Sequence, residues 1–67
     1  MPIIEVKLFD HRLKEGVVDK IIAALTDGLC EACGEEVRER TEVIVQGISP
    51  EVWGFGGRTV TSTGPTA

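Results

Sequence analysis

The sequence predicts an α+β fold in which a β-α-β unit is followed by a short C-terminal hairpin. Residues 2–9 and 41–48 alternate along the chain with the period of two that is typical of β-strands. Between them, residues 14–33 carry an apolar stripe at the three-and-four spacing of an amphipathic helix. A helix between two strands of one sheet makes a crossover, and the two strands are then parallel.

The first predicted strand has two different faces. Ile4, Val6 and Leu8 point to one side, and we expect this apolar face to meet the helix. The opposite face mixes apolar and charged side chains, which suits a partly covered surface or a subunit contact. Its members are Ile3, Glu5, Lys7 and Phe9.

The predicted helix has a glycine near each of its ends, and it contains both cysteines. Gly16 weakens its first turn by up to about 1 kcal/mol relative to alanine, and Gly34 is a natural terminator. Cys30 and Cys33 form a Cys-x-x-Cys spacing in the last turn, the wrong end of a helix for a redox motif. A zinc site would need two more ligands, and the chain has one His. We therefore interpret them as small helical residues, at least one of them buried.

After the second strand, Pro50 predicts a turn, because proline cannot donate to a strand ladder. Glycines around the aromatic residues of segment 53–58 predict a tight hairpin. Residues 60–67 are rich in Thr, Ser, Gly and Pro, and we expect a short edge strand that leads into a frayed tail.

Length and charge exclude several function classes. The 67 residues make a single domain, 1–67, which is marginal as a monomer, so we expect oligomerisation. A net charge of −4 argues against nucleic acid as the main partner. No apolar run is long enough to cross a membrane and no signal peptide is visible, so the expected location is cytoplasmic.

Pro2 is the most reactive candidate in the chain. Removal of the initiator Met1 would leave its nitrogen as a secondary amine, whereas a retained Met1 would make it an amide. An α-amino group titrates near pH ~8, and burial or a nearby arginine lowers that pKa, so the amine could act as a general base. The alternative is that Pro2 is merely tolerated at the start of a strand.

The end of the first strand offers two further candidates. His11 follows Asp10, but adjacent residues of an extended segment point to opposite sides, so we expect His11 to be a surface residue rather than half of a catalytic pair. Arg12 could bind a carboxylate through its forked guanidinium. The alternative for Arg12 is a solvated charge in a turn.

The chain resembles the 4-oxalocrotonate tautomerase family over about residues 2–60. Three features together carry the resemblance: Pro2 directly after the initiator Met1, Arg12 ten residues later, and segment 50–57 after a β-α-β unit. The resemblance implies a dimer with a four-stranded sheet and a hexamer built as a trimer of dimers. It also implies an isomerase of aromatic catabolism that needs no metal or organic cofactor. Pro2 matches the catalytic proline, Arg12 a carboxylate-binding arginine, and Trp53, which Phe55 would assist, an aromatic residue that keeps the amine's surroundings apolar.

One position departs from the family. Glu42 stands where the family has a second arginine, and its carboxylate would repel a dianionic substrate. Arg40, two residues earlier on the predicted strand face, is either a replacement or a solvated charge. Three interpretations stay open: a monoacid substrate, activation of water by Glu42 as in hydratases and dehalogenases of the superfamily, or a heterohexamer whose related subunit supplies the arginine.

The predicted function is enol–keto tautomerisation of a 2-hydroxy-dienoate or similar unsaturated carboxylic acid by a homohexamer. Pro2 is the general base of this prediction, and the proton moves by a 1,3- or 1,5-transfer. The alternatives are a non-catalytic or complementing subunit of a hetero-oligomeric tautomerase, and a hydratase or dehalogenase.

Overall fold

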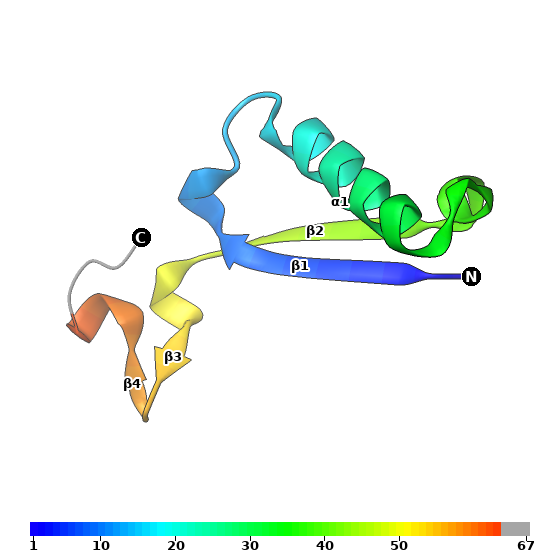
Figure 1. Cartoon of the computed structure of the whole chain (residues 1–67). Helices are drawn as coiled ribbons and strands as arrows, with labels where there is room; N and C mark the ends of the chain where they lie inside the picture. The colour runs from blue at the N-terminus through cyan, green and yellow to red at the C-terminus, as the bar shows by residue number, and fades with distance from the viewer. Residues whose placement is uncertain (64–67) are drawn as a thin grey trace.

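The computed structural model describes residues 1–63, with the backbone alone for residues 62 and 63. Strand β1 (Ile3–Phe9) leads through a loop to helix α1 (Val17–Cys33), and the chain returns in strand β2 (Glu42–Ile48) (Figure 1). The two strands are parallel, in a register that runs from Ile3 opposite Glu42 to Phe9 opposite Ile48. The predicted β-α-β unit is therefore confirmed.

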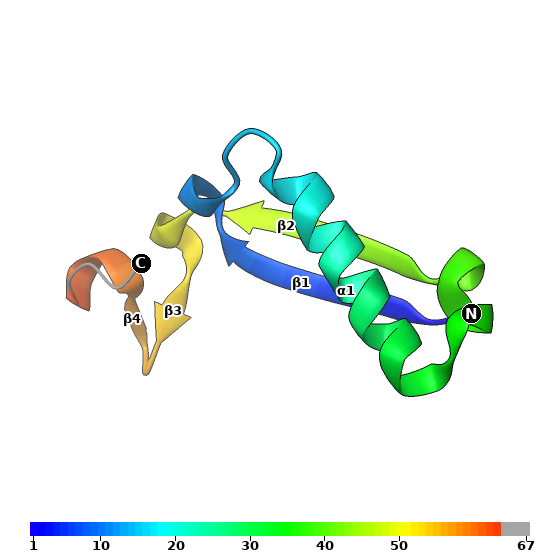
Figure 2. The same ribbon diagram turned by 45° about the horizontal axis from the view of Figure 1, so that its top comes forward.

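The alternation of the two strands produces the two layers of the fold. Ile4, Val6 and Leu8 of β1 are half-buried on the side of α1, whereas Ile3 and Glu5 on the other side are exposed. Figure 2 shows α1 lying across one face of the sheet, while the opposite face carries no element of the described chain. The helix contributes an apolar stripe to the covered face at the predicted three-and-four spacing, although Val18 and Ile22 of the predicted stripe are each 37% exposed. The half-buried or buried members of that stripe are Val17, Ile21, Leu25, Leu29 and Cys30.

The start of the helix was predicted wrongly. Residue 14 was the expected beginning, but α1 begins at Val17, because Gly16 has a φ of 82°. That left-handed conformation cannot continue a right-handed helix and is one that glycine adopts without strain. The end was predicted correctly: Gly34 has a φ of 106°, and its N–H donates to the Cys30 carbonyl oxygen at 2.7 Å.

The charged connector after α1 is a 3₁₀ helix, η2 (Glu35–Arg40), held to α1 by Arg38. Its guanidinium donates to Glu35 Oε1 and to Asp27 Oδ1, each at 2.9 Å. Arg40 ends η2, two residues before β2 begins. The expectation that Arg40 shares a strand face with Glu42 is therefore wrong, since the chain is still turning at that point.

Beyond β2, a further 3₁₀ helix, η3 (Pro50–Val52), begins after Ser49, whose side-chain oxygen accepts from the Glu51 N–H at 3.1 Å. The predicted hairpin follows, with β3 (Gly54–Phe55) antiparallel to β4 (Arg58–Thr59). Its turn residues Gly56 and Gly57 have φ values of 53° and 84°. Two positive φ angles in a row are what a two-residue hairpin turn of the type I′ class requires.

The segment predicted as an edge strand and frayed tail is partly ordered. Residues Val60–Thr63 form a 3₁₀ helix, η4, and the Val60 side chain is only 3% exposed. The Val60 N–H donates to the Trp53 carbonyl oxygen at 2.8 Å, which fixes the start of η4 beside the hairpin. The prediction was wrong here because a composition rich in Thr and Ser says nothing about one buried valine. The remainder of the predicted tail, 64–67, lies outside the described residues.

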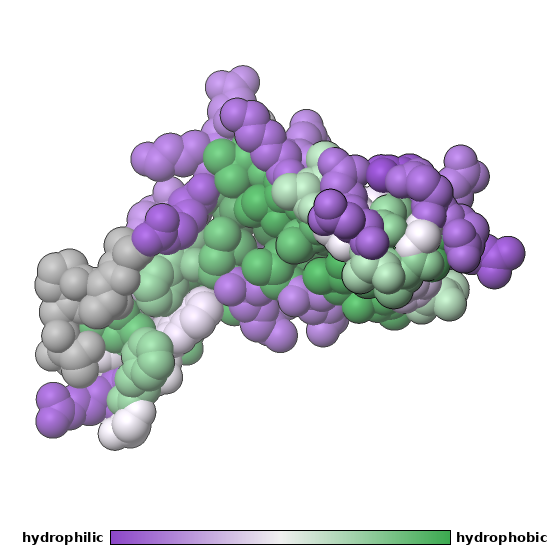
Figure 3. All heavy atoms as spheres, viewed as in Figure 1, coloured by the Kyte–Doolittle hydropathy of each residue, from purple (hydrophilic) through white to green (hydrophobic). Residues whose placement is uncertain are grey.

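The chain exposes more surface than a folded monomer of its size. Its radius of gyration is 14.8 Å, against about 11 Å for a compact domain of this length. Its accessible surface is 4946 Å², against roughly 4,100 Å² expected. Apolar residues lie uncovered along the sheet, η3 and the hairpin (Figure 3), and Ile3, Val52 and Phe55 are 57%, 75% and 63% exposed. Surfaces of this kind are typical of a subunit that packs against other chains.

None of the helices within residues 1–63 combines the length and the apolar character that crossing a membrane requires.

Candidate active site

Pro2 lies at the end of the sheet where β1 begins. Its carbonyl oxygen accepts a hydrogen bond from the Glu42 N–H at 2.9 Å, so the first residue of β2 is directly beside it. The Pro2 side chain is half-buried, and Met1 before it is 77% exposed. Met1 is thus open to the removal that a reactive Pro2 nitrogen requires.

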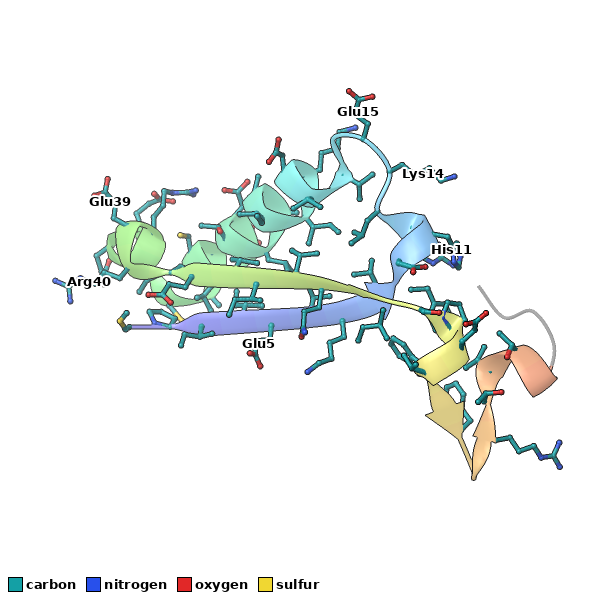
Figure 4. The ribbon with its side chains drawn as sticks, turned by 180° about the vertical axis from the view of Figure 1, so that it is seen from behind. Glu5, His11, Lys14, Glu15, Glu39 and Arg40 are labelled. Carbon is teal, nitrogen blue, oxygen red and sulfur yellow. The ribbon has the colours of Figure 1, made fainter. Side chains whose placement is uncertain are left out.

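A cavity of about 580 Å³ opens at this end of the molecule. It is lined by Met1, Pro2, Glu36, Val37 and Arg40, so the turn of η2 brings a cation and a carboxylate to the cavity that Pro2 lines. Figure 4 shows Arg40 projecting from this end, far from His11. Sequence reasoning did not single out Glu36 or Val37, because residues 35–40 carry no apolar period that predicts which side of a turn faces β1.

The two arginines of η2 have different roles. Arg38 is held between Glu35 and Asp27, and its hydrogen bonds to these two carboxylates raise the pKa of its guanidinium. In turn, the hydrogen bond from Arg38, and after it the positive charge of Arg38, lowers the pKa of Glu35. Arg40 makes no ion pair with any of the described residues. Arg40 is therefore the η2 cation that is open to a ligand.

The other candidate residues lie at the opposite end of β1. Arg12 is the exposed last residue of the 3₁₀ helix η1 (Asp10–Arg12), and within residues 1–63 it has no acidic partner. Trp53 is half-buried and meets Phe9 edge-on, with ring centroids 4.6 Å apart. His11, which is exposed as expected, stacks on Phe9 with ring centroids 5.8 Å apart.

A close approach of β2 positions η1. A Cβ atom at Gly47 would lie 2.7 Å from Leu13 Cδ1 and 3.2 Å from Asp10 Cα. The absence of a side chain at Gly47 is thus what allows η1, with Arg12 at its end, to lie against β2. The sequence contained this glycine but no signal for the contact, which joins residues more than thirty positions apart.

One chain cannot bring the two sets of candidates together. The seven residues of β1 separate Pro2 from η1, and at roughly 3.3 Å per residue they span about 23 Å. A small carboxylic acid cannot reach Pro2 and Arg12 of the same copy. Any site that uses both must combine the Pro2 end of one copy with the Arg12 and Trp53 end of another.

The sequence was compared with known proteins by family and by individual relatives. A family model described as "Tautomerase enzyme" matches residues 2–62. This chain belongs to the tautomerase family. Neither the curated proteins nor the solved structures give a match. Family membership supports an isomerase or a related activity for this tautomerase chain, and it agrees with the α+β architecture.

The remaining motif of the tautomerase chain lies in the last turn of α1. Cys30 is 6% exposed and Cys33 is exposed, and both are free thiols of α1. The interpretation of these cysteines as helical residues, at least one of them buried, is confirmed.

Proposed function

We propose that this tautomerase-family chain is a 4-oxalocrotonate tautomerase-like isomerase that acts on a 2-hydroxy-dienoate or a similar unsaturated acid. The observation that carries the proposal is the position of Pro2, which lines an open cavity together with Arg40 at the start of β1. Once Met1 is removed, the nitrogen of Pro2, which lines that cavity, is a secondary amine. Partial burial favours the neutral, basic form of such an amine.

The proposed reaction needs one base and one anion-binding group. The neutral Pro2 nitrogen takes the enol hydroxyl proton as the C–O bond becomes a carbonyl, and it then returns a proton to carbon 3 or carbon 5 of the conjugated chain. Arg12 of a second copy binds the substrate carboxylate through two parallel hydrogen bonds. Arg40 stabilises the oxygen on which negative charge develops. Trp53 of that second copy excludes water, which strengthens these electrostatic interactions.

Glu42 restricts the substrate in this proposal. It is the first residue of β2, its N–H bonds to Pro2, and its carboxylate is exposed near the cavity end of the sheet. A second substrate carboxylate would meet this negative charge. We therefore propose that the physiological substrate is a monoacid.

The 23 Å separation of the candidates supports a site that is shared between copies of the chain. We propose a homohexamer, a trimer of dimers with a four-stranded sheet in each dimer. The exposed apolar residues of the sheet and hairpin support this proposal. A heterohexamer in which a related subunit supplies a second arginine near Pro2 is the alternative. Native mass spectrometry of the chain expressed alone distinguishes them, because an active homohexamer needs no second subunit.

The same position of Glu42 favours one other activity. Glu42 is hydrogen-bonded to Pro2 through its main chain, and its carboxylate could activate a water molecule. Activation of water is the step that a hydratase or dehalogenase requires. Turnover of a haloacrylate that is lost in Glu42→Gln would support this activity. Retention of isomerase activity in Glu42→Gln, with improved use of a diacid, would support the isomerase.

The test of the proposal distinguishes the role of the basic Pro2 nitrogen from the role of the proline side chain. Ultraviolet assays of monoacid and diacid enols are run on the wild type, on Pro2→Ala, and on a variant with one alanine inserted before Pro2. The insertion keeps the proline but turns its nitrogen into an amide, and intact mass establishes the first residue of each sample. We expect the insertion to abolish activity and Pro2→Ala to lower it by about 10²-fold or more. Wild-type rates in the insertion variant would overturn the proposal.

A further inference from the structure

Arg38 links the connector η2 to helix α1 through all three nitrogens of its guanidinium. Its Nε and Nη2 donate to the two carboxylate oxygens of Glu35, at 2.9 and 3.0 Å, and its Nη1 donates to Asp27 Oδ1 at 2.9 Å. Glu35 is the first residue of η2, whereas Asp27 belongs to α1. Because the fork to Glu35 fixes the plane of the guanidinium, the group has a defined position between the two elements.

Little else fixes the rotation of η2 about its own axis. None of its residues is buried, and Val37 alone is half-buried. Within the described part of the chain, Arg38 is the one member of η2 whose side chain bonds to another element. The Thr41 hydroxyl donates to the Val37 carbonyl oxygen at 2.7 Å, but this bond joins η2 to the residue that ends it. The rotation of η2 therefore depends on Arg38 and on the packing of Val37.

The two sides of η2 line different cavities. In a 3₁₀ helix, residues three apart lie in one row, so Glu35 and Arg38 share a row. Val37 and Arg40 share the next row by the same rule. Glu35 lines a cavity against α1, whereas Val37 and Arg40 line the cavity of Pro2. One row of η2 is thus bound to α1, and the adjacent row faces the candidate site.

We propose that Arg38 is a positioning residue, which fixes the rotation of η2 against α1 and so directs Arg40 to the cavity that Pro2 lines. Arg40 lies two residues after Arg38 in the same short helix, so a rotation that separates Arg38 from Asp27 also redirects Arg40. Figure 4 shows Arg40 and its neighbour Glu39 leaving η2 in different directions. The inference deepens the proposed function and rests on it, since Arg38 acts through Arg40.

The link contributes direction more than stability. The side chains of Arg38, Asp27 and Glu35 are 42%, 65% and 74% exposed. Ion pairs this exposed add little to the free energy of folding. A shift of about 1 Å in a catalytic group, in contrast, can lower a rate by about a hundredfold. Loss of the link should therefore affect turnover far more than unfolding.

The test is a double-mutant cycle between the link and Arg40. Asp27→Ala removes the α1 end of the link, and alanine is the residue that a helix interior favours most. Both kcat and KM are measured with a monoacid enol for the wild type, Asp27→Ala, Arg40→Ala and the double variant. The matched control is Glu31→Ala, which removes a carboxylate one turn further along α1 that makes no ion pair within residues 1–63.

We expect Asp27→Ala to lower kcat by about tenfold with little change in KM, because Arg40 acts on the developing charge while Arg12 binds the carboxylate. In the Arg40→Ala background, the same substitution should have no further effect. Glu31→Ala should keep the wild-type kcat. A wild-type kcat in Asp27→Ala, an equal loss in both backgrounds, or an equal loss in Glu31→Ala would each overturn the proposal.

A second measurement needs no turnover. Relaxation of the main-chain ¹⁵N nuclei reports how rigidly residues 36–40 are held, and Asp27→Ala should lower their order parameters relative to the wild type and to Glu31→Ala. Unchanged order parameters in Asp27→Ala would overturn the proposal. An inactive wild type in which Asp27→Ala still loosens η2 would support the role of Arg38 in fixing η2 and contradict the proposed reaction, so the two failures are distinguishable.

Discussion

Gly47→Ala tests the contact through which β2 positions η1. The new Cβ would lie 2.7 Å from Leu13 Cδ1 and 3.2 Å from Asp10 Cα. The Leu13 side chain can rotate away, but the Asp10 main chain can move only if η1 moves with it. Overpacking of this kind costs about 1–3 kcal/mol. We therefore expect Gly47→Ala to lower the free energy of unfolding by that amount and, because η1 carries Arg12, to raise KM for a carboxylate substrate.

Gly28→Ala is the matched control. A Cβ at Gly28 would meet nothing within 4 Å, and the residue lies inside α1. Alanine in a helix interior is favoured over glycine by about 0.5–1 kcal/mol, so this variant should be more stable than the wild type. Both variants are unfolded in urea at one fixed protein concentration, since association adds to the measured stability.

The outcome for Gly47→Ala decides whether the contact is as described. Stability equal to the wild type, in a preparation where Gly28→Ala behaves as expected, would refute the reasoning. A second variant, Leu13→Ala in the Gly47→Ala background, removes the nearer of the two contacts and leaves the approach to Asp10. KM should stay raised in this double variant if the approach to the Asp10 main chain is what displaces η1.

Two further predictions concern other parts of the chain. Arg38 lowers the pKa of Glu35 below its ordinary value of 4.5, so this pair stabilises the fold fully above that pH and loses its effect as the pH falls through the lowered pKa. Urea midpoints of the wild type and Glu35→Gln should therefore converge on acidification, and a difference that stays constant with pH would contradict this. Val60→Ala should lower the free energy of unfolding by about 1.5 kcal/mol or more, since the side chain is 3% exposed. An unchanged urea midpoint for Val60→Ala would show that η4 contributes nothing to stability.

The β-α-β unit could be predicted from the sequence because its signals are local and periodic. Each strand alternates over seven residues, the helix keeps its apolar stripe, and Gly34 ends it. The hairpin was predictable for a similar reason, since the pair Gly56 and Gly57 permits a turn with positive φ at both positions. Patterns of this kind depend on neighbours along the chain and need no tertiary contact.

The features that were missed depend on turns or on distant residues. The sequence does not show whether Gly16 lies inside the helix or before it. Its positive φ in the structure places it before the helix. The charged stretch 35–40 gave no sign that its 3₁₀ turn directs Glu36 and Arg40 to the cavity of Pro2. The burial of Val60 depends on packing beside the hairpin, which composition does not encode.

The candidate site was predicted as a set of residues but not as an arrangement. Pro2 and Arg12 were selected for their chemistry, and the length of β1 shows that the two belong to opposite ends of a chain. The contact between Trp53 and Phe9 was not predicted, although both aromatics were visible in the sequence. Their meeting depends on how η3 returns the chain to the end of β1.

The composite site is tested most directly by mixing two inactive variants, Pro2→Ala and Arg12→Ala. In a mixed dimer, the Pro2 of one chain and the Arg12 of the other still form one intact site. Random association makes about half of the dimers mixed, so we expect about a quarter of the wild-type activity to return at low substrate concentration. Mixed oligomers that native mass spectrometry shows to contain both chains, yet that remain inactive, would contradict a site shared between copies.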